Sequence, residues 1–142
     1  MTQIGADLTL MNADSRLTEI IIGAAYDVHN ELGTGFLEAV YQRALAVELG
    51  RLAINVSIEV PLAVYYKGVN VGDYRADLLV EDEVIIEVKA TDAIAPVHEQ
   101  QLVHYLHATK RPLGLIVNFG RSVTVRRKVV SKNQRQSASN LR

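Results

Sequence analysis

Two short apolar segments joined by three acidic residues constrain this sequence most. Residues 75–80 read Arg-Ala-Asp-Leu-Leu-Val, residues 81–83 read Glu-Asp-Glu, and residues 84–89 read Val-Ile-Ile-Glu-Val-Lys. Apolar runs of this kind on either side of a short polar gap are typical of a β-hairpin. A charged side chain inside such a strand is costly unless it is paired or binds an ion. Asp77, Glu87 and Lys89 are therefore the first candidates for a functional site.

The register of this hairpin decides whether the charged side chains meet. If residues 81–83 form the whole loop, Asp77 lies directly opposite Glu87, with Cβ atoms about 5 Å apart on the same face. Lys89 shares that face, because it is two residues from Glu87. A two-residue turn would instead shift the pairing by one residue and separate the two carboxylates. An exposed hairpin with ordinary surface charges is the simpler alternative, and the pattern alone leaves it open.

Carboxylates and a lysine gathered in this way suit metal-assisted hydrolysis. Asp77 and Glu87 can hold Mg²⁺ or Mn²⁺, because hard cations prefer oxygen ligands and Mg²⁺ needs only one or two carboxylates. A divalent cation between them also makes the repulsion of two like charges tolerable. Such a cation would lower the pKa of a water molecule bound to it.

Composition excludes several other kinds of site. The chain has no cysteine, so disulfides, thiolate zinc sites, iron–sulfur clusters and cysteine nucleophiles are ruled out. His98, His104 and His107 lie on or near one expected helix, but no third ligand at matching spacing completes a zinc site. The sequence shows neither a secretory signal nor an apolar run of about 20 residues that could span a membrane. We therefore expect a cytoplasmic protein with no membrane partner.

Charge is distributed unevenly along the chain. All 16 acidic residues lie in residues 1–99, whereas residues 100–142 hold nine of the 15 basic residues, and the net charge is −1. A basic final third suggests a polyanionic partner such as nucleic acid. An equally weighted alternative is that these bases pair with the acidic part of the same fold.

Patterning predicts a single α/β domain at residues 14–130, after a loose lead-in at 1–13 and before a polar, disordered tail at 131–142. The second helix is expected to bury a face of Leu37, Val40, Val47 and either Ala44 or Tyr41. The order α, α, β, β, β, α, β, β implies a mixed β-sheet flanked by helices. The expected helices are 14–32, 36–49 and 97–108, and the expected strands are 55–66, 71–80, 84–90, 112–118 and 122–130.

Four sequence blocks together resemble one known family. Gly35-Phe-Leu-Glu38-Ala-Val-Tyr41 matches the pattern that names the GxxExxY protein family. Residues 29–35 (HNELGTG), 101–106 (QLVHYL) and 114–120 (GLIVNFG) resemble further blocks of that family, in the same order. The likeness covers roughly residues 17–128, and the family is grouped with the PD-(D/E)xK nuclease-like superfamily. The resemblance implies a restriction-endonuclease-like αβββαβ core.

The same resemblance implies roles for the acidic residues. Asp77 and Glu87 would bind the metal, together with the backbone carbonyl of Val88. Glu38 would be the helix-borne acid that orients the water or completes the shell of a second metal. The residue before Asp77 is Ala76, so the proline of the superfamily's name is missing here.

Further roles follow for the basic and polar residues. Lys89 would stabilise the attacking hydroxide or the phosphorus centre. Gln101 and Tyr105 match a Gln-x-x-x-Tyr helix motif, and they would hydrogen-bond the phosphate or hold the lysine in place. Tyr41 is expected to pack with its hydroxyl satisfied. His29 either approaches the acidic cluster or favours the helix C-terminus.

The sequence thus predicts a Mg²⁺- or Mn²⁺-dependent nuclease acting on nucleic-acid phosphodiesters, with DNA ahead of RNA. The alternative is a catalytically silent module that binds nucleic acid or protein on the same fold. A more remote option is a metal-dependent hydrolase with a different substrate. A domain of this size is also expected to use a homodimer or a partner protein to hold a long substrate.

Overall fold

The structure, a computed structural model, describes the backbone of residues 2–130 and the side chains of residues 15–130. The predicted order of helices and strands is confirmed, and the predicted tail at 131–142 lies outside the described residues. The elements are α1 (Thr2–Leu32), α2 (Glu38–Arg51), β1 (Val56–Tyr66), β2 (Val69–Val80), β3 (Val84–Lys89), α3 (Pro96–Thr109), β4 (Leu113–Phe119) and β5 (Val123–Val129).

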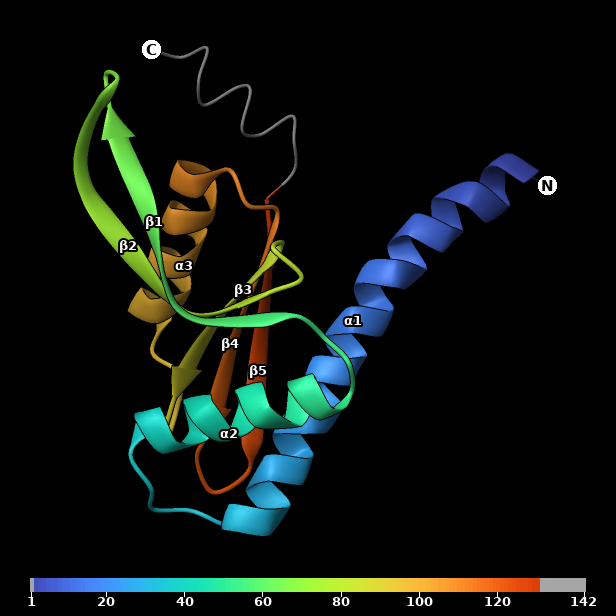
Figure 1. Ribbon diagram of the computed structural model, residues 1–142, viewed down its shortest axis with the longest axis vertical. Helices are drawn as coiled ribbons and strands as arrows, with labels where there is room; N and C mark the ends of the chain where they lie inside the picture. Colours follow the sequence, from blue (N-terminus) through green and yellow to red (C-terminus); the bar gives the residue numbers. More distant parts are fainter. Residues whose placement is uncertain (1, 131–142) are drawn as a thin grey trace.

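The strands form one mixed five-stranded sheet in the order β1-β2-β3-β4-β5 (Figure 1). Neighbouring strands are antiparallel except β3 and β4, which are parallel. A parallel pair needs a long crossover between its strands, and α3 provides it. The predicted α/β class with a mixed sheet and flanking helices is confirmed.

Helices cover both faces of the sheet and create two cores. On one face, α1 and α2 pack against apolar residues that include Leu78, Ile86 and Val88, a set that we call the two-helix core. On the other face, Leu102 and Leu106 of α3 pack with residues of β2, β3 and β4, a set that we call the α3 core. All seven residues of β4 are buried, as expected for a strand covered on both faces. The strands that carry Asp77, Glu87 and Lys89, β2 and β3, therefore lie inside the sheet, between two helical layers.

Helix α1 begins earlier than predicted. It starts at Thr2 instead of near Asp14, so residues 2–13, which were expected to belong to a loose lead-in, are helical backbone. A helix does not require an amphipathic period, and this stretch is rich in strong helix formers such as alanine, leucine and methionine. Its end at Leu32 agrees with the prediction. No helix in the described part of the chain is long and apolar enough to cross a membrane.

Helix α2 buries a different face from the one predicted. Leu37, Val40 and Val47 are exposed, whereas the buried residues are Tyr41, Gln42, Leu45 and Leu49. The sequence carries two apolar stripes on this helix, and periodicity does not rank them. The choice is made by tertiary contact, because the ring of Tyr41 stacks on Phe119 of β4 with centroids 4.6 Å apart.

Candidate functional site

The hairpin of β2 and β3 has the register that a three-residue loop requires. Val80 pairs with Val84, and the ladder continues to Leu78 and Ile86. Two loop residues, Glu81 and Asp82, adopt positive φ angles of 52° and 58° to close the turn. The described ladder stops one pair before Asp77 and Glu87. The two acids therefore lie next to the last paired residues, where the backbone is no longer tied into this ladder.

Strand β2 changes its orientation at Asp77. Ala76 belongs to the α3 core and Leu78 to the two-helix core, although residues two apart in a regular strand share a face. On the neighbouring strand β1, Glu59 has a positive φ of 52°, and the pair between Glu59 and Asp77 is missing from the ladder. The strong local twist frees Asp77 from β1 and lets it bond to β3 instead.

The carboxylate of Asp77 is held by the backbone of β3. Its Oδ2 accepts a hydrogen bond of 2.8 Å from the amide of Val88, the residue between Glu87 and Lys89. Burial raises the pKa of Asp77, while the Val88 amide and the positive charge of Lys89 act in the opposite direction. The negative charge of Glu38 adds to the rise in pKa. Asp77 is thus placed directly beside the Glu-x-Lys element.

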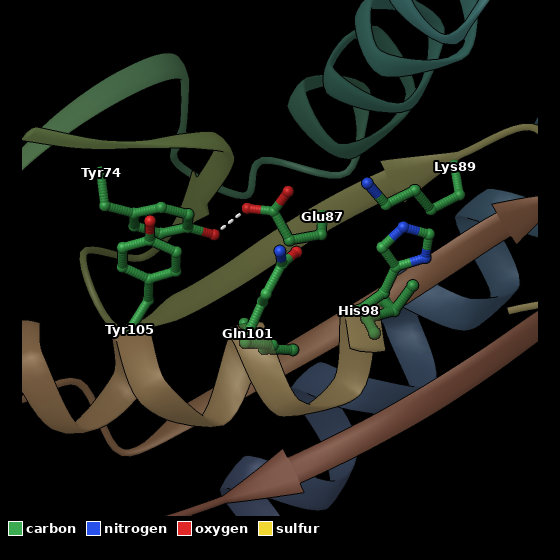
Figure 2. A pocket seen from close by; sticks show the side chains of 8 residues that line it. Tyr74, Glu87, Lys89, His98, Gln101 and Tyr105 are labelled. Atoms are coloured by element: carbon green, nitrogen blue, oxygen red, sulfur yellow. Dashed lines mark hydrogen bonds between the residues drawn. The ribbon is translucent and has the colours of Figure 1, made fainter. Parts of the chain in front are cut away.

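Glu87 occupies a partly desolvated position on the α3 side of the sheet. Burial raises its pKa from 4.5 to about 7, although the positive charge of Lys89 and the backbone of Asp77 act to lower it. The hydroxyl of Tyr74 donates a hydrogen bond to Oε1 of Glu87 (Figure 2). The ring of Tyr74 in turn stacks on Tyr105 of α3, with centroids 3.9 Å apart and an interplanar angle of 14°. Tyr105 is therefore connected to Glu87 indirectly, because it stacks on the ring of Tyr74.

Between β3 and α3 lies a pocket lined by four of the predicted residues, whereas Asp77 and Glu38 are not among its lining residues. Figure 2 shows Glu87 and Lys89 projecting from β3 toward Gln101 on the helix. Lys89 is close enough to lower the pKa of both carboxylates, yet in the described part of the chain it forms no direct ion pair. The pocket is lined by Tyr74, Glu87, Lys89, His98, Gln101, Leu102, Tyr105 and Ile116.

Glu38 approaches the two acids from the opposite helical layer. It is the first residue of α2 and is exposed. Its charge contributes to the raised pKa values of Asp77 and Glu87. The loop before it is held by Tyr41, which is fully buried and donates a hydrogen bond of 2.5 Å to the carbonyl of Gly33. Tyr41 thus packs with a satisfied hydroxyl, as predicted.

The donor set fits a hard cation that needs few protein ligands. Among residues 15–130, no group of three or more His, Cys, Asp and Glu side chains is arranged to hold a metal. Asp77 bonds to the amide that follows Glu87, the backbone of Asp77 bonds to Glu87, and the charge of Glu38 acts on both acids, so the two carboxylates are neighbours. Mg²⁺ is bound by one or two carboxylates and keeps several waters. This chemistry therefore suits Mg²⁺ or Mn²⁺ better than zinc, which would need a closed set of ligands.

The end of β3 is anchored by the block at residues 114–120. Asn118 is buried, and its side-chain amide forms two 2.9 Å hydrogen bonds with the backbone of Thr91, just after the strand. A Cβ atom at Gly120 would lie 2.6 Å from the carbonyl oxygen of Thr91, so only glycine allows this approach. Nε2 of His29 lies 2.9 Å from the carbonyl oxygen of Gly120. His29 does not line the pocket. These contacts fix the segment that follows Lys89.

Some bases of the C-terminal third pair with acidic residues of the same fold, and others are exposed. Lys128 pairs with Glu99 of α3 at 2.7 Å, and Arg111 lies 3.6 Å from Asp82. The hydrogen bond from Lys128 lowers the pKa of Glu99. Arg126 and Arg127 of β5, by contrast, are exposed and available to a polyanion.

Two polar residues of the pocket, Tyr74 and His98, were not predicted from the sequence as site residues. Tyr74 lies on β2 and contacts Glu87 only because of the strand twist, so no local pattern marked it. His98 was considered only as a zinc ligand beside His104 and His107. A search of the helix for residues three apart would have placed His98 on the same face as Gln101 and Tyr105.

One family of known proteins matches most of the chain. The model of a family described as the PD-(D/E)XK nuclease superfamily matches residues 15–130. Among solved structures, the crystal structure of SSO0001 is similar over 71% of this chain, with 16% sequence identity and a TM-score of 0.47. The match covers 55% of the length of the SSO0001 chain, about half. A comparison with curated proteins found no match.

Proposed function

The chain belongs to the PD-(D/E)XK nuclease superfamily, and from this premise we propose that it is a Mg²⁺- or Mn²⁺-dependent nuclease that hydrolyses phosphodiester bonds. The observation that carries the proposal is the convergence of Asp77, Glu87 and Lys89 beside one pocket. Within the superfamily, the motif from Gly35 through Glu38 to Tyr41 supports assignment to the GxxExxY family.

Each side chain has a role that follows from its position. Asp77 and Glu87, with the carbonyl of Val88, would hold the cation, which supplies an activated water and neutralises charge on the phosphate. Lys89 is free to donate to a phosphate oxygen, and its positive charge stabilises the charge that develops there. Gln101 offers a further hydrogen bond from α3. Glu38 faces the same acids from α2 and is suited to orienting a water molecule.

Tyrosine contacts give the site its rigidity. Tyr74 donates to one oxygen of Glu87, which leaves the other oxygen for the cation. Tyr105 supports the ring of Tyr74 by stacking. Tyr105 therefore acts as a positioning residue for Glu87, a role that differs from both earlier expectations, a hydrogen bond to the phosphate or a contact that holds Lys89 in place.

The proposed substrate is nucleic acid, with DNA ahead of RNA, and the proposed setting is the cytoplasm. The exposed Arg126 and Arg127 supply a sequence-independent attraction to a phosphate backbone. The proposed domain comprises residues 14–130, and a second copy or a partner protein would extend its grip on a long substrate.

Cleavage assays on labelled single- and double-stranded DNA and RNA, with Mn²⁺ or EDTA, test the proposal. Asp77→Asn keeps an oxygen for the Val88 amide but removes the charge, and Lys89→Met keeps the length of the side chain. Each should lower kcat by at least about 100-fold, the usual effect of removing one electrostatic contact to a transition state. The matched controls are Asp73→Asn and Lys67→Met, which change the same residue types at exposed positions of the β1–β2 hairpin.

The controls should cleave at the rate of the unmodified protein. Equal activity in all variants would mean contamination and would refute the assignment of the site. Binding of nucleic acid that is salt-sensitive, indifferent to metal and without cleavage would favour the silent binding module.

A further inference from the structure

His98 lies in the pocket at the start of α3. It follows Pro96, the first residue of the helix, and it is half-buried. It lines the same pocket as Glu87, Lys89 and Gln101. In Figure 2 its imidazole faces the amino group of Lys89 from the opposite wall. None of the roles assigned above uses this side chain.

The surroundings of the imidazole determine which nitrogen carries its proton. Nδ1 of His98 is buried and has no hydrogen-bond partner in the described part of the chain. A buried N–H without an acceptor is rarer and more costly than a buried lone pair without a donor. We assign the proton to Nε2 on this ground, since hydrogen positions are inferred from such networks. His98 therefore presents an N–H donor to the pocket.

This part of the pocket offers several donors, and its acceptors are the carbonyl of Gln101 and the second oxygen of Glu87, which was assigned above to the cation. Lys89 offers an ammonium group without a direct ion pair in residues 15–130, and Gln101 offers an amide. Oε1 of Glu87 already accepts from Tyr74. An N–H of His98 that faces an ammonium group needs an acceptor between them, and an anionic oxygen fits this space.

We propose that His98 is a phosphate-binding residue of this site, donating from Nε2 to a non-bridging oxygen of the phosphate that Lys89 contacts. The assignment rests on the proposed nuclease function and deepens it, because it adds a directional donor to the point charge of Lys89.

His107 provides a matched control on the same helix. Its Nδ1 is likewise buried without a partner, but the residue does not line the pocket. An unpartnered nitrogen by itself therefore does not mark a functional histidine. What distinguishes His98 is that its remaining nitrogen faces Lys89.

The kinetic test compares His98→Ala, His98→Gln and His98→Asn with His107→Gln. Glutamine places an amide N–H near the position of Nε2, whereas asparagine is too short to do so. His98→Ala should lower kcat/KM for Mn²⁺-dependent DNA cleavage by about 10- to 100-fold, the effect of losing a hydrogen bond to a charged group. His98→Gln should recover most of this loss and His98→Asn little of it, with thermal stability unchanged, and His107→Gln should cleave normally.

A second arm does not depend on turnover. Imidazole ¹⁵N spectra of the unmodified protein should report the Nε2–H tautomer at His98, and titration with inorganic phosphate should shift that signal but not the signal of His107. If the protein cleaves nothing, the nuclease proposal fails and this arm alone decides whether His98 binds phosphate. A Nδ1–H tautomer, an absent phosphate shift, or equal activity of His98→Ala and His107→Gln would overturn the assignment.

Discussion

Replacing Glu87 by glutamine should stabilise the protein at neutral and alkaline pH while it abolishes cleavage. Glu87 lies in a partly desolvated position, where its ionised form is unfavourable. Glutamine has nearly the same shape and keeps an oxygen that can accept the hydrogen bond from Tyr74. The substitution therefore removes the buried charge without removing the packing, which isolates the cost of placing a carboxylate there.

The sign and size of the effect follow from the raised pKa. Burial raises the pKa of Glu87 from 4.5 to about 7, so between these values the folded state holds a proton that the unfolded chain has released. Stability contributed by this group is present below about pH 4.5 and is lost as the pH rises to about 7. At about 1.4 kcal/mol per pKa unit, the loss reaches about 3 kcal/mol. Asp77, whose pKa is also raised by burial, adds a change of the same sign.

Urea denaturation measured across this pH range would test the prediction. Unmodified protein and Glu87→Gln should be equally stable near pH 4, and the variant should become more stable by up to about 3 kcal/mol near pH 8. Added Mn²⁺ should offset the loss in the unmodified protein and have little effect on the variant, because the cation favours ionised carboxylates.

Glu99→Gln is a control for which the dependence of stability on pH should have the opposite sign. The hydrogen bond from Lys128 lowers the pKa of Glu99, so its contribution is present above the unfolded pKa and is lost as the pH falls. If Glu87→Gln were less stable than the unmodified protein at pH 8, the account of Glu87 as a desolvated carboxylate would be wrong.

Two further substitutions test the frame around the site. Tyr41→Phe removes the hydroxyl that bonds the carbonyl of Gly33, and it should lower the free energy of unfolding by about 1–3 kcal/mol in urea denaturation; an unchanged value would mean that water replaces the hydroxyl. Gly120→Ala should destabilise by about 1–3 kcal/mol, because its Cβ would lie 2.6 Å from the carbonyl oxygen of Thr91. Gly23→Ala, with open space in a helix, should instead stabilise by up to about 1 kcal/mol, and equal effects of the two alanines on the melting temperature would contradict the close approach at Gly120.

Local patterns predicted the elements with little error. The three-residue loop at 81–83 and the apolar runs around it led to the register in which Val80 pairs with Val84. The glycine after Leu32 marked the end of α1, and the order of strands and helices implied a mixed sheet. Such features depend on neighbours in the chain, so one sequence is enough to infer them.

Errors arose where a choice between similar local options depended on distant residues. Helix α2 has two apolar stripes, and stacking of Tyr41 on Phe119 selects the one that is buried. The N-terminal half of α1 lacks an amphipathic period and is still helical. Neither outcome can be obtained from periodicity, because periodicity reports a pattern and not the surface that covers it.

Some residues of the candidate site were likewise found from the sequence, and others only from the tertiary structure. Asp77, Glu87 and Lys89 stood out in the sequence because a charged residue within an apolar strand is costly unless it is paired or binds an ion. Their catalytic and metal-binding roles stay predictions, and so do those of Glu38, Gln101 and Tyr105. Tyr74 and His98 joined the pocket only through the twist of β2 and the crossover of α3.

By itself, then, the sequence determined the order of elements and the identity of the charged groups, since these follow from composition and spacing, and it left the hairpin register conditional on a three-residue loop. Only the tertiary structure decided which helix face is buried, that Tyr74 holds Glu87, and that His98 faces Lys89. The physical reason is that side-chain directions across a twisted sheet depend on a missing ladder pair at Glu59 and Asp77. The missing pair depends on the contact between two strands, so the sequence of either strand alone does not predict it.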